Sequence, residues 1–199
     1  MIEVEIRGPL TKTEAAALKT TLLKHGRLVA TKDREMILLL DGYPGEDRDP
    51  TKRTTDIRLK RTNGHCEIVV KQKLSDGNVG RREINLPLAT GDLEVAKQVA
   101  AAFGAQSGIW MQRTLEVFDT PDGIEWVVGR APHRSGSPVR YFFEAELEVD
   151  DESQIEAARK KLVSAARSFT LDPITEDAKM RDFLYGLDAD VNDEFELTI

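Results

Sequence analysis

The chain has 199 residues, of which 40% are hydrophobic and 32% charged, with a formal net charge of −7. This length supports one domain with a substantial core, and the acidic balance excludes a broad nucleic-acid-binding surface, which would be predominantly basic. The single cysteine, Cys66, excludes an internal disulfide and a cysteine-rich zinc site, and no apolar run approaches the roughly 20 residues of a membrane span, so we expect a cytoplasmic protein without membrane contact.

The first stretch, residues 2–7, predicts a strand with two unlike faces. Apolar residues hold its even positions, and charged residues hold its odd positions: Glu3, Glu5 and Arg7. Because side chains alternate along a strand, the charged groups share one face. Taken alone, this alternation is also typical of an antiparallel sheet with one face in water. In either case the strand places two carboxylates and a guanidinium side by side.

A helix and a short strand are predicted next. Thr11 and Glu14 form a capping-box pattern ahead of apolar residues at helical spacing, and Gly26 lies at the expected C-terminal cap. We therefore expect a helix over 11–24. The apolar run 35–40 has the length of a strand, and a polar loop follows it.

Three strands then carry most of the basic charge. They are predicted at 56–61, 67–73 and 81–86, and Asn63-Gly64 is a strong hairpin signal between the first two. On each strand the charged residues alternate with apolar ones, so that they share a face. The basic residues of these faces are Arg58, Lys60, Lys71, Lys73 and Arg81.

The middle of the chain predicts a second helix and two more strands. The helix runs from about Asp92 to Phe103, and strands are expected at 110–118, which contains Arg113, and at 124–128. Large aromatic residues in this region and just after it are expected to face outward, into a core between sheet and helices: Trp110, Trp126, Phe142 and Phe143.

The last predicted strand, residues 142–149, resembles the first in its alternation. Its acidic side chains share one face: Glu144, Glu146 and Glu148. A helix is expected over 153–168, and a shorter helix begins near Thr175 and carries Lys179. The chain therefore begins and ends its series of strands with carboxylates, whereas the strands between them are mostly basic.

The order of the elements predicts one domain over 1–186 and an acidic tail over 187–199, which we expect to be solvated. Seven or eight strands with few helices favour an antiparallel barrel or a strongly curved sheet. If the charged faces point inward, the bases need carboxylates, water and a polyanionic ligand to compensate them, and the apolar faces pack outward against the helices. Carboxylates at this spacing suit a hard divalent cation, and Arg and Lys suit phosphate oxygens.

The residues of these strands resemble a known family. Glu3-Val4-Glu5-Ile6-Arg7 resembles the ExExK signature of the CYTH domain, the superfamily of triphosphate tunnel metalloenzymes that includes inorganic triphosphatases, thiamine triphosphatases and class IV adenylate cyclases. Further positions agree in order along almost the whole chain: Ile57-Arg58-Leu59-Lys60, Val69-Val70-Lys71, Arg81-Arg82-Glu83-Ile84, Arg113, Glu144-Ala145-Glu146 and Ala178-Lys179-Met180. Three features depart from the family pattern: Arg7 replaces a lysine, the strand 36–40 lacks Asp-x-Tyr, and the loop Arg130–Pro138 lacks Gly-x-Gly.

The resemblance implies an α+β fold in which helices flank an eight-stranded antiparallel β-barrel, a tunnel with a charged interior. It implies hydrolysis of a triphosphate with Mg²⁺ or Mn²⁺, and we favour inorganic triphosphate as the substrate. A class IV adenylate cyclase, which converts ATP to cyclic AMP, and a non-catalytic polyphosphate- or nucleotide-binding module are the alternatives. Both a monomer and a homodimer are open.

The resemblance and the charged faces together predict a role for each site residue. The predicted catalytic residues are Glu3, Glu5 and Arg7. The predicted metal ligands are Glu3, Glu5, Glu144 and Glu146. The predicted substrate-binding residues are Arg58, Lys60, Lys71, Lys73, Arg81, Arg113 and Lys179.

Overall fold

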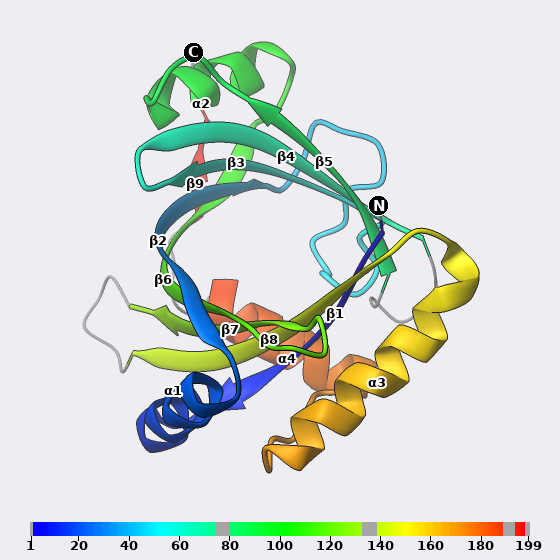
Figure 1. Cartoon of the computed structure of the whole chain (residues 1–199). Helices are drawn as coiled ribbons and strands as arrows, with labels where there is room; N and C mark the ends of the chain where they lie inside the picture. Colours follow the sequence, from blue (N-terminus) through cyan, green and yellow to red (C-terminus); the bar gives the residue numbers. More distant parts are fainter. Residues whose placement is uncertain (1, 75–79, 133–138, 189–193, 198–199) are drawn as a thin grey trace.

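The protein is built around one antiparallel sheet that closes on itself. The computed structural model describes residues 2–74, 80–132, 139–188 and 194–197. The strands follow the order β2-β3-β4-β5-β1-β8-β7-β6, and pairing of β2 with β6 closes the barrel. Figure 1 shows these strands surrounding a common axis, with the helices outside them. The predicted eight-stranded antiparallel barrel is confirmed.

The strands are longer than the sequence predicted. Those of the barrel are β1 (Ile2–Leu10), β2 (Arg27–Leu39), β3 (Thr55–Thr62), β4 (His65–Lys73), β5 (Gly80–Pro87), β6 (Ser107–Asp119), β7 (Glu125–Ala131) and β8 (Arg140–Val149). A short strand, β9 (Glu194–Glu196), pairs with the start of β6. The turn between β3 and β4 uses Asn63 and Gly64 at positive φ, as the hairpin signal predicted.

The helices lie on two sides of the barrel (Figure 1). They are α1 (Lys12–His25), α2 (Leu93–Ala102), α3 (Ile155–Ser168) and α4 (Asp177–Asp188), with a short 3-10 turn, η1 (Glu152–Gln154), before α3. The predicted capping box of α1 is present, since Thr11 and Glu14 exchange side-chain to backbone hydrogen bonds of 2.7 and 3.2 Å. No helix in the described part of the chain is long and apolar enough to cross a membrane.

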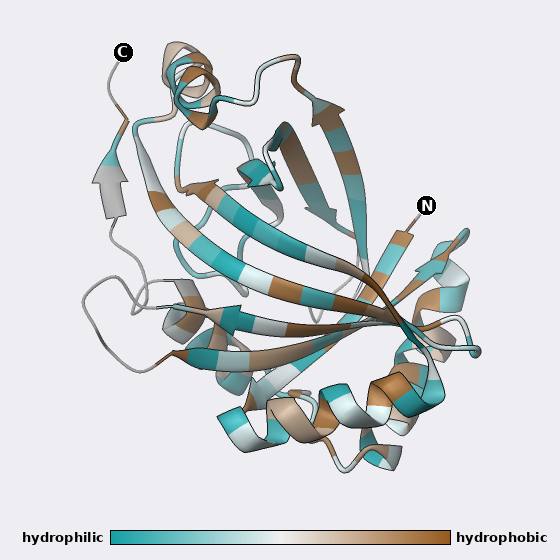
Figure 2. Cartoon of the chain, turned by 60° about the vertical axis from the view of Figure 1, so that its left-hand side comes forward, coloured by the Kyte–Doolittle hydropathy of each residue, from teal (hydrophilic) through white to brown (hydrophobic). Residues whose placement is uncertain are grey.

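The apolar faces of the strands pack outward, under the helices. On one side Val4 and Ala145, both fully buried, join a core with Leu22 of α1 and Leu162 of α3. On the other side α2 covers a second core that contains Leu59 and other buried residues. The strands in Figure 2 accordingly change between hydrophilic and hydrophobic colours along their length. Because side chains alternate, the charged faces point into the barrel.

Most strands contribute charged residues to the interior, as predicted, and β2 and β6 add an apolar part. Met36, Leu38 and Met111 are at most 2% exposed and form an apolar cluster on β2 and β6. Their neighbours Ile37 and Leu39 pack into the core with α2, so alternation turns Met36 and Leu38 inward. One wall of the barrel is therefore apolar.

The orientation of the Phe142 side chain differs from the prediction, which was that it faces outward. It shares the inward face of β8 with Glu144 and is fully buried in a cluster with Leu115, Val127 and Leu187. The prediction failed because Phe142 and Phe143 are adjacent, and adjacent strand residues must face opposite ways. Phe143 packs outward as expected.

The described part of the C-terminal segment, residues 187–188 and 194–197, contains two buried side chains, although 187–199 was predicted to be a solvated tail. Helix α4 extends to Asp188, and Leu187 is 2% exposed in the cluster with Phe142. Leu197 is 8% exposed and packs into the core with α2. These two apolar side chains anchor the segment, because the free energy gained by burying each one opposes release of the chain.

Candidate functional site

Three carboxylates converge inside the barrel. Glu3 and Glu5 lie two residues apart on the inward face of β1, and Glu146 of β8 is paired with Glu5 in the strand register. One carboxylate oxygen from each residue lies within 4.8 Å of the others. Oxygen ligands at this spacing suit a hard divalent cation. The structure therefore brings together three of the four predicted metal ligands.

The electrostatics of this group also fit a cation. Burial, together with the carboxylates of Glu5, Glu3 and Glu144, raises the pKa of Glu146 well above its ordinary value. Burial likewise raises the pKa of Glu3, although Lys71 opposes it. Burial therefore disfavours the ionised forms of Glu146 and Glu3, and a bound cation would stabilise them.

Arg7 connects this group to the fourth predicted ligand. Its guanidinium forms an ion pair with Glu5 and lies 3.6 Å from Glu144. Burial alone would raise the pKa of Glu5, but Arg7, Lys71 and Arg81 outweigh it and lower that pKa to about 2. Glu144 therefore lies beside Arg7 and Glu5, although it is not one of the three carboxylates whose oxygens all lie within 4.8 Å of one another.

Lys71 links the carboxylates to the basic strands. Its ammonium lies 2.8 Å from Glu3 and 2.7 Å from Glu83 of β5. Burial would raise the pKa of Glu83, but the ammonium of Lys71 and a weaker effect of Lys60 lower it to about 2. Lys60 itself points inward and lies 3.0 Å from Glu67. Both lysines are thus inside the barrel with carboxylate partners.

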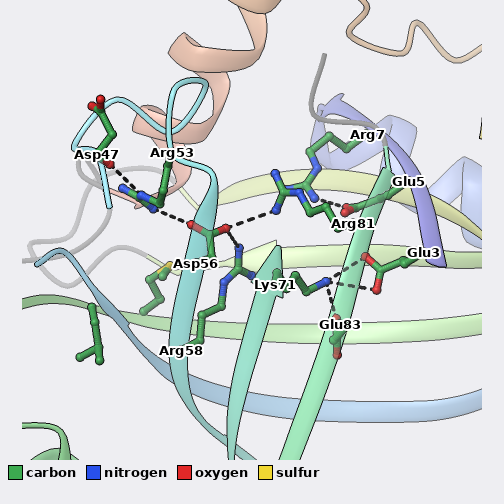
Figure 3. Close-up of polar contacts among 12 residues, drawn as sticks. Glu3, Glu5, Arg7, Asp47, Arg53, Asp56, Arg58, Lys71, Arg81 and Glu83 are labelled. Atoms are coloured by element: carbon green, nitrogen blue, oxygen red, sulfur yellow. Dashed lines mark hydrogen bonds and ion pairs between the residues drawn. The ribbon is translucent and has the colours of Figure 1, made fainter. Parts of the chain in front are cut away.

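Asp56 is the centre of the largest cationic group (Figure 3). Arg58 of β3 and Arg81 of β5 both donate to its Oδ2, at 3.0 and 3.3 Å. Arg53, from the loop before β3, donates to Oδ1 at 3.0 Å. The side chains of Asp56 and Arg81 are 12% exposed, and that of Arg53 is 5% exposed. A single buried carboxylate thus holds three guanidinium groups together.

Arg113 and Lys73 extend the basic surface. Arg113 is 7% exposed, and its guanidinium lies 5.4 Å from the centre of the Phe142 ring. Arg34 is paired with it in the β2–β6 register, and burial lowers the pKa of Arg34. The ammonium of Lys73 donates to the backbone oxygen of Thr51 at 3.1 Å. Apart from Lys179, the predicted basic residues all lie on inward faces.

The structure does not bring Lys179 to this interior. Its ammonium lies 2.7 Å from Glu176, which directly precedes α4, and the side chain of Lys179 is 67% exposed. It lines an external groove of about 890 Å³ between α1 and α4. The position of a short helix relative to the barrel depends on tertiary packing, which the local sequence pattern does not encode.

Three charged residues of the interior escaped the sequence prediction. Asp56 stands two positions before Arg58 on the same strand face, and this spacing is a signal that could have identified it. Arg34 is in phase with Met36 but precedes the predicted start of that strand. Arg53 lies in an irregular loop, where no periodicity indicates a direction.

Comparisons with known proteins show likeness in structure but not in sequence. No protein-family model matches the chain, and no curated protein matches it. The PH1819 protein from Pyrococcus horikoshii aligns with a TM-score of 0.68 and 20% identity, over 92% of this chain and 98% of that chain.

Two further solved structures carry functional descriptions. HpAC1 from Hippeastrum, a candidate adenylyl cyclase with a dominant triphosphatase activity, aligns with a TM-score of 0.55 and 15% identity, over 88% of this chain and 90% of that chain. The Mimivirus capping enzyme triphosphatase aligns with a TM-score of 0.52 and 11% identity, over 82% and 89% of the two chains. At these identities the likeness shows the fold alone, and that fold is the predicted closed antiparallel barrel with flanking helices.

Proposed function

We propose that the protein hydrolyses inorganic triphosphate inside the barrel with the help of Mg²⁺ or Mn²⁺. The observation that carries the proposal is the meeting of two opposite charge groups in one interior. Arg58, Arg81 and Lys71 lie on the basic strands, and the carboxylates of Glu3 and Glu5 lie on the adjoining strand. A phosphate chain and a divalent cation together complement this arrangement.

The basic residues would hold and neutralise the phosphate chain. Burial, with the nearby guanidinium groups of Arg7 and Arg58, lowers the pKa of Arg81 despite its ion pair with Asp56. Burial therefore disfavours the charged form of Arg81, and an anionic ligand beside it would stabilise that form. Fixed guanidinium groups of this kind also stabilise the charge that develops on phosphoryl oxygens during transfer.

The carboxylates of Glu3, Glu5 and Glu146 would hold the metal. When bound, a divalent cation there supplies polarisation of the terminal phosphoryl group and orientation of a water molecule. Arg7 keeps its proton at neutral pH because Glu5 and Glu144 raise the pKa of its buried guanidinium. Its contribution is therefore electrostatic, and it also holds Glu5 in position through their ion pair.

A second candidate is an organic triphosphate, including ATP as the substrate of a class IV adenylate cyclase. Apolar residues of the interior, Met36, Leu38 and Met111, are at most 2% exposed, so an adenine or another organic ring would have to displace their neighbours to contact them. The third candidate, a module that binds without turnover, uses the same basic residues. The three candidates differ in the product that forms.

One experiment separates these candidates. The protein is incubated with tripolyphosphate or ATP, in Mg²⁺, Mn²⁺ or chelator, and phosphate release, cyclic AMP and binding are measured. We expect metal-dependent release of phosphate from tripolyphosphate and no cyclic AMP. Cyclic AMP formation would establish the cyclase instead, and saturable binding without either product would establish the binding module. Lys160→Ala, which removes an exposed charge on α3, serves as the control with unchanged activity.

A further inference from the structure

Asp56 has a geometry that differs from that of a simple surface ion pair. Arg58 and Arg81 come from β3 and β5, which are separated in the sheet by β4. Nevertheless they converge on the same oxygen, Oδ2 of Asp56. An oxygen that two guanidinium groups share in this way occupies the position where both would bind one oxygen of a phosphate.

The carboxylate is strongly held in the empty barrel. Burial by itself would raise the pKa of Asp56, but the charges of Arg58, Arg81 and Arg53 outweigh burial and place that pKa well below its ordinary value. Asp56 therefore stays ionised at every pH at which the protein would meet a triphosphate. Without a ligand, the carboxylate of Asp56 is therefore the anion that compensates these arginines.

We propose that Asp56 competes with bound triphosphate for Arg58 and Arg81, and that this competition sets the affinity of the barrel for its ligand. The inference rests on the proposed function, because it assumes that these arginines bind the phosphate chain. A ligand must displace Oδ2 from at least part of each guanidinium and must also approach a fixed negative charge. We take a phosphate of the ligand and the Asp56 carboxylate to lie about 8 Å apart, at an effective dielectric constant of about 20. Their repulsion then weakens ligand binding by more than about tenfold.

Arg53 explains how the barrel tolerates this competition. A buried carboxylate that lost all of its partners on ligand binding would be left uncompensated, at a large cost. Arg53 bonds the other oxygen, Oδ1, at 3.0 Å and also donates from Nε to the backbone oxygen of Asp47 at 2.7 Å. It lies outside the pair of arginines that the ligand would take. Asp56 thus keeps one partner while it gives up the other two, and the ligand can later be released.

The test compares Asp56→Asn with the wild type and with Asp33→Asn. Asp33 is exposed on β2, so its substitution changes the net charge equally without touching the interior. Binding of tripolyphosphate is titrated by calorimetry in the presence of a chelator, which prevents metal-dependent turnover. We expect Asp56→Asn to bind on the order of tenfold more tightly than the wild type, and Asp33→Asn to bind within about twofold of it. A merely structural role of Asp56 would not produce tighter binding.

Equal or weaker binding by Asp56→Asn, with saturable binding by the wild type, overturns this inference and leaves the proposed function intact. A wild type without saturable binding in chelator overturns the inference, whereas the proposed function is overturned only if phosphate release in Mg²⁺ or Mn²⁺ is also absent. Asp56→Ser provides a second variant in case the asparagine protein does not fold without ligand. If both variants fail to fold even with tripolyphosphate, Asp56 is a structural counter-ion and the inference is wrong.

Discussion

Glu5 and Glu146 face each other across two strands, yet their charges act on the folded protein in opposite directions. Three basic residues lower the pKa of Glu5 to about 2, so its ionised form stabilises the fold. Burial and three neighbouring carboxylates raise the pKa of Glu146, so its ionised form opposes folding. A bound cation would stabilise the ionised form of Glu146, whereas Glu5 is ionised without it because basic residues surround its carboxylate.

We expect Glu5→Gln to lower, and Glu146→Gln to raise, the melting temperature of the metal-free protein at neutral pH. The free energy of unfolding should change by on the order of 1 kcal/mol or more in each case. Both substitutions should severely reduce the proposed metal-dependent hydrolysis, since each removes a proposed metal ligand. Melting curves in chelator and phosphate release in Mg²⁺ measure the two effects separately. Shifts of the same sign in both variants would contradict the assigned charge balance.

Asp56 gives a pH dependence at the same scale. Its lowered pKa means that its ionised form stabilises the fold above the unfolded pKa of about 3.9, and that this contribution is lost as pH falls through the folded value. The difference in unfolding free energy between wild type and Asp56→Asn should therefore be constant from about pH 7 to pH 5 and should shrink below about pH 4. Urea titrations across this range measure it. A difference that grows on acidification would show that the charge of Asp56 does not stabilise the fold.

The sequence predicted the direction of most site residues because strand alternation decides it. Glu3, Glu5, Arg58 and Lys71 all lie on the predicted faces. Alternation says nothing about distance between strands, so it could not show that Glu144 lies beside Arg7 while Glu146 joins the carboxylate group. Those positions depend on the stagger of neighbouring strands in the closed barrel.

At the scale of elements, β2 shows where the strand signal fails. The sequence predicted only its second half, whereas the strand begins at Arg27. The register between β2 and β6 shifts between Leu28 and Ala30, which indicates a bulge. A bulge adds a residue to one strand, so that side chains no longer alternate regularly between the two faces of the sheet. The first half of β2 therefore has no simple sequence pattern that would predict a strand.

The close contact between β7 and β8 depends on a glycine, Gly129, which has no side chain. A Cβ on Gly129 would lie 2.1 Å from the ring of Phe142, which is fully buried. We expect Gly129→Ala to destabilise the protein by about 1–3 kcal/mol through overpacking. Chemical denaturation measures this change.

Phe142→Leu supplies the matched test of that explanation. The smaller side chain should make room for the added methyl group, so that the double variant loses less stability than the sum of the two single changes. Strict additivity would show that the alanine acts through the backbone and not through the ring.

At the scale of the whole molecule, ligand and fold are coupled through the interior charge. Tripolyphosphate at about 100 times its dissociation constant should add about 2.7 kcal/mol to the free energy of unfolding. In a protein of this size that raises the melting temperature by several degrees. We expect the double substitution Arg58→Ala, Lys60→Ala to remove most of this increase, because both side chains face the interior.

The matched control is Lys12→Ala, Lys160→Ala, which removes the same charge from exposed helical positions. It should keep the full increase in melting temperature. An equal response to tripolyphosphate in both double variants would show that the anion binds outside the barrel.

The position of β1 in the barrel has a consequence for how the chain folds. Val4 is paired with Gly80 on one side and with Leu147 on the other, so the first strand is inserted between strands that come much later in the sequence. During synthesis β1 leaves the ribosome before its partners β5 and β8. The second of them, β8, is complete only when nearly three quarters of these residues have been added. Pairings between such distant segments slow folding, because a long loop must close before any contact compensates its entropy. The barrel therefore cannot close during translation until β8 emerges, and until then the apolar face of β1 is a natural target for chaperones.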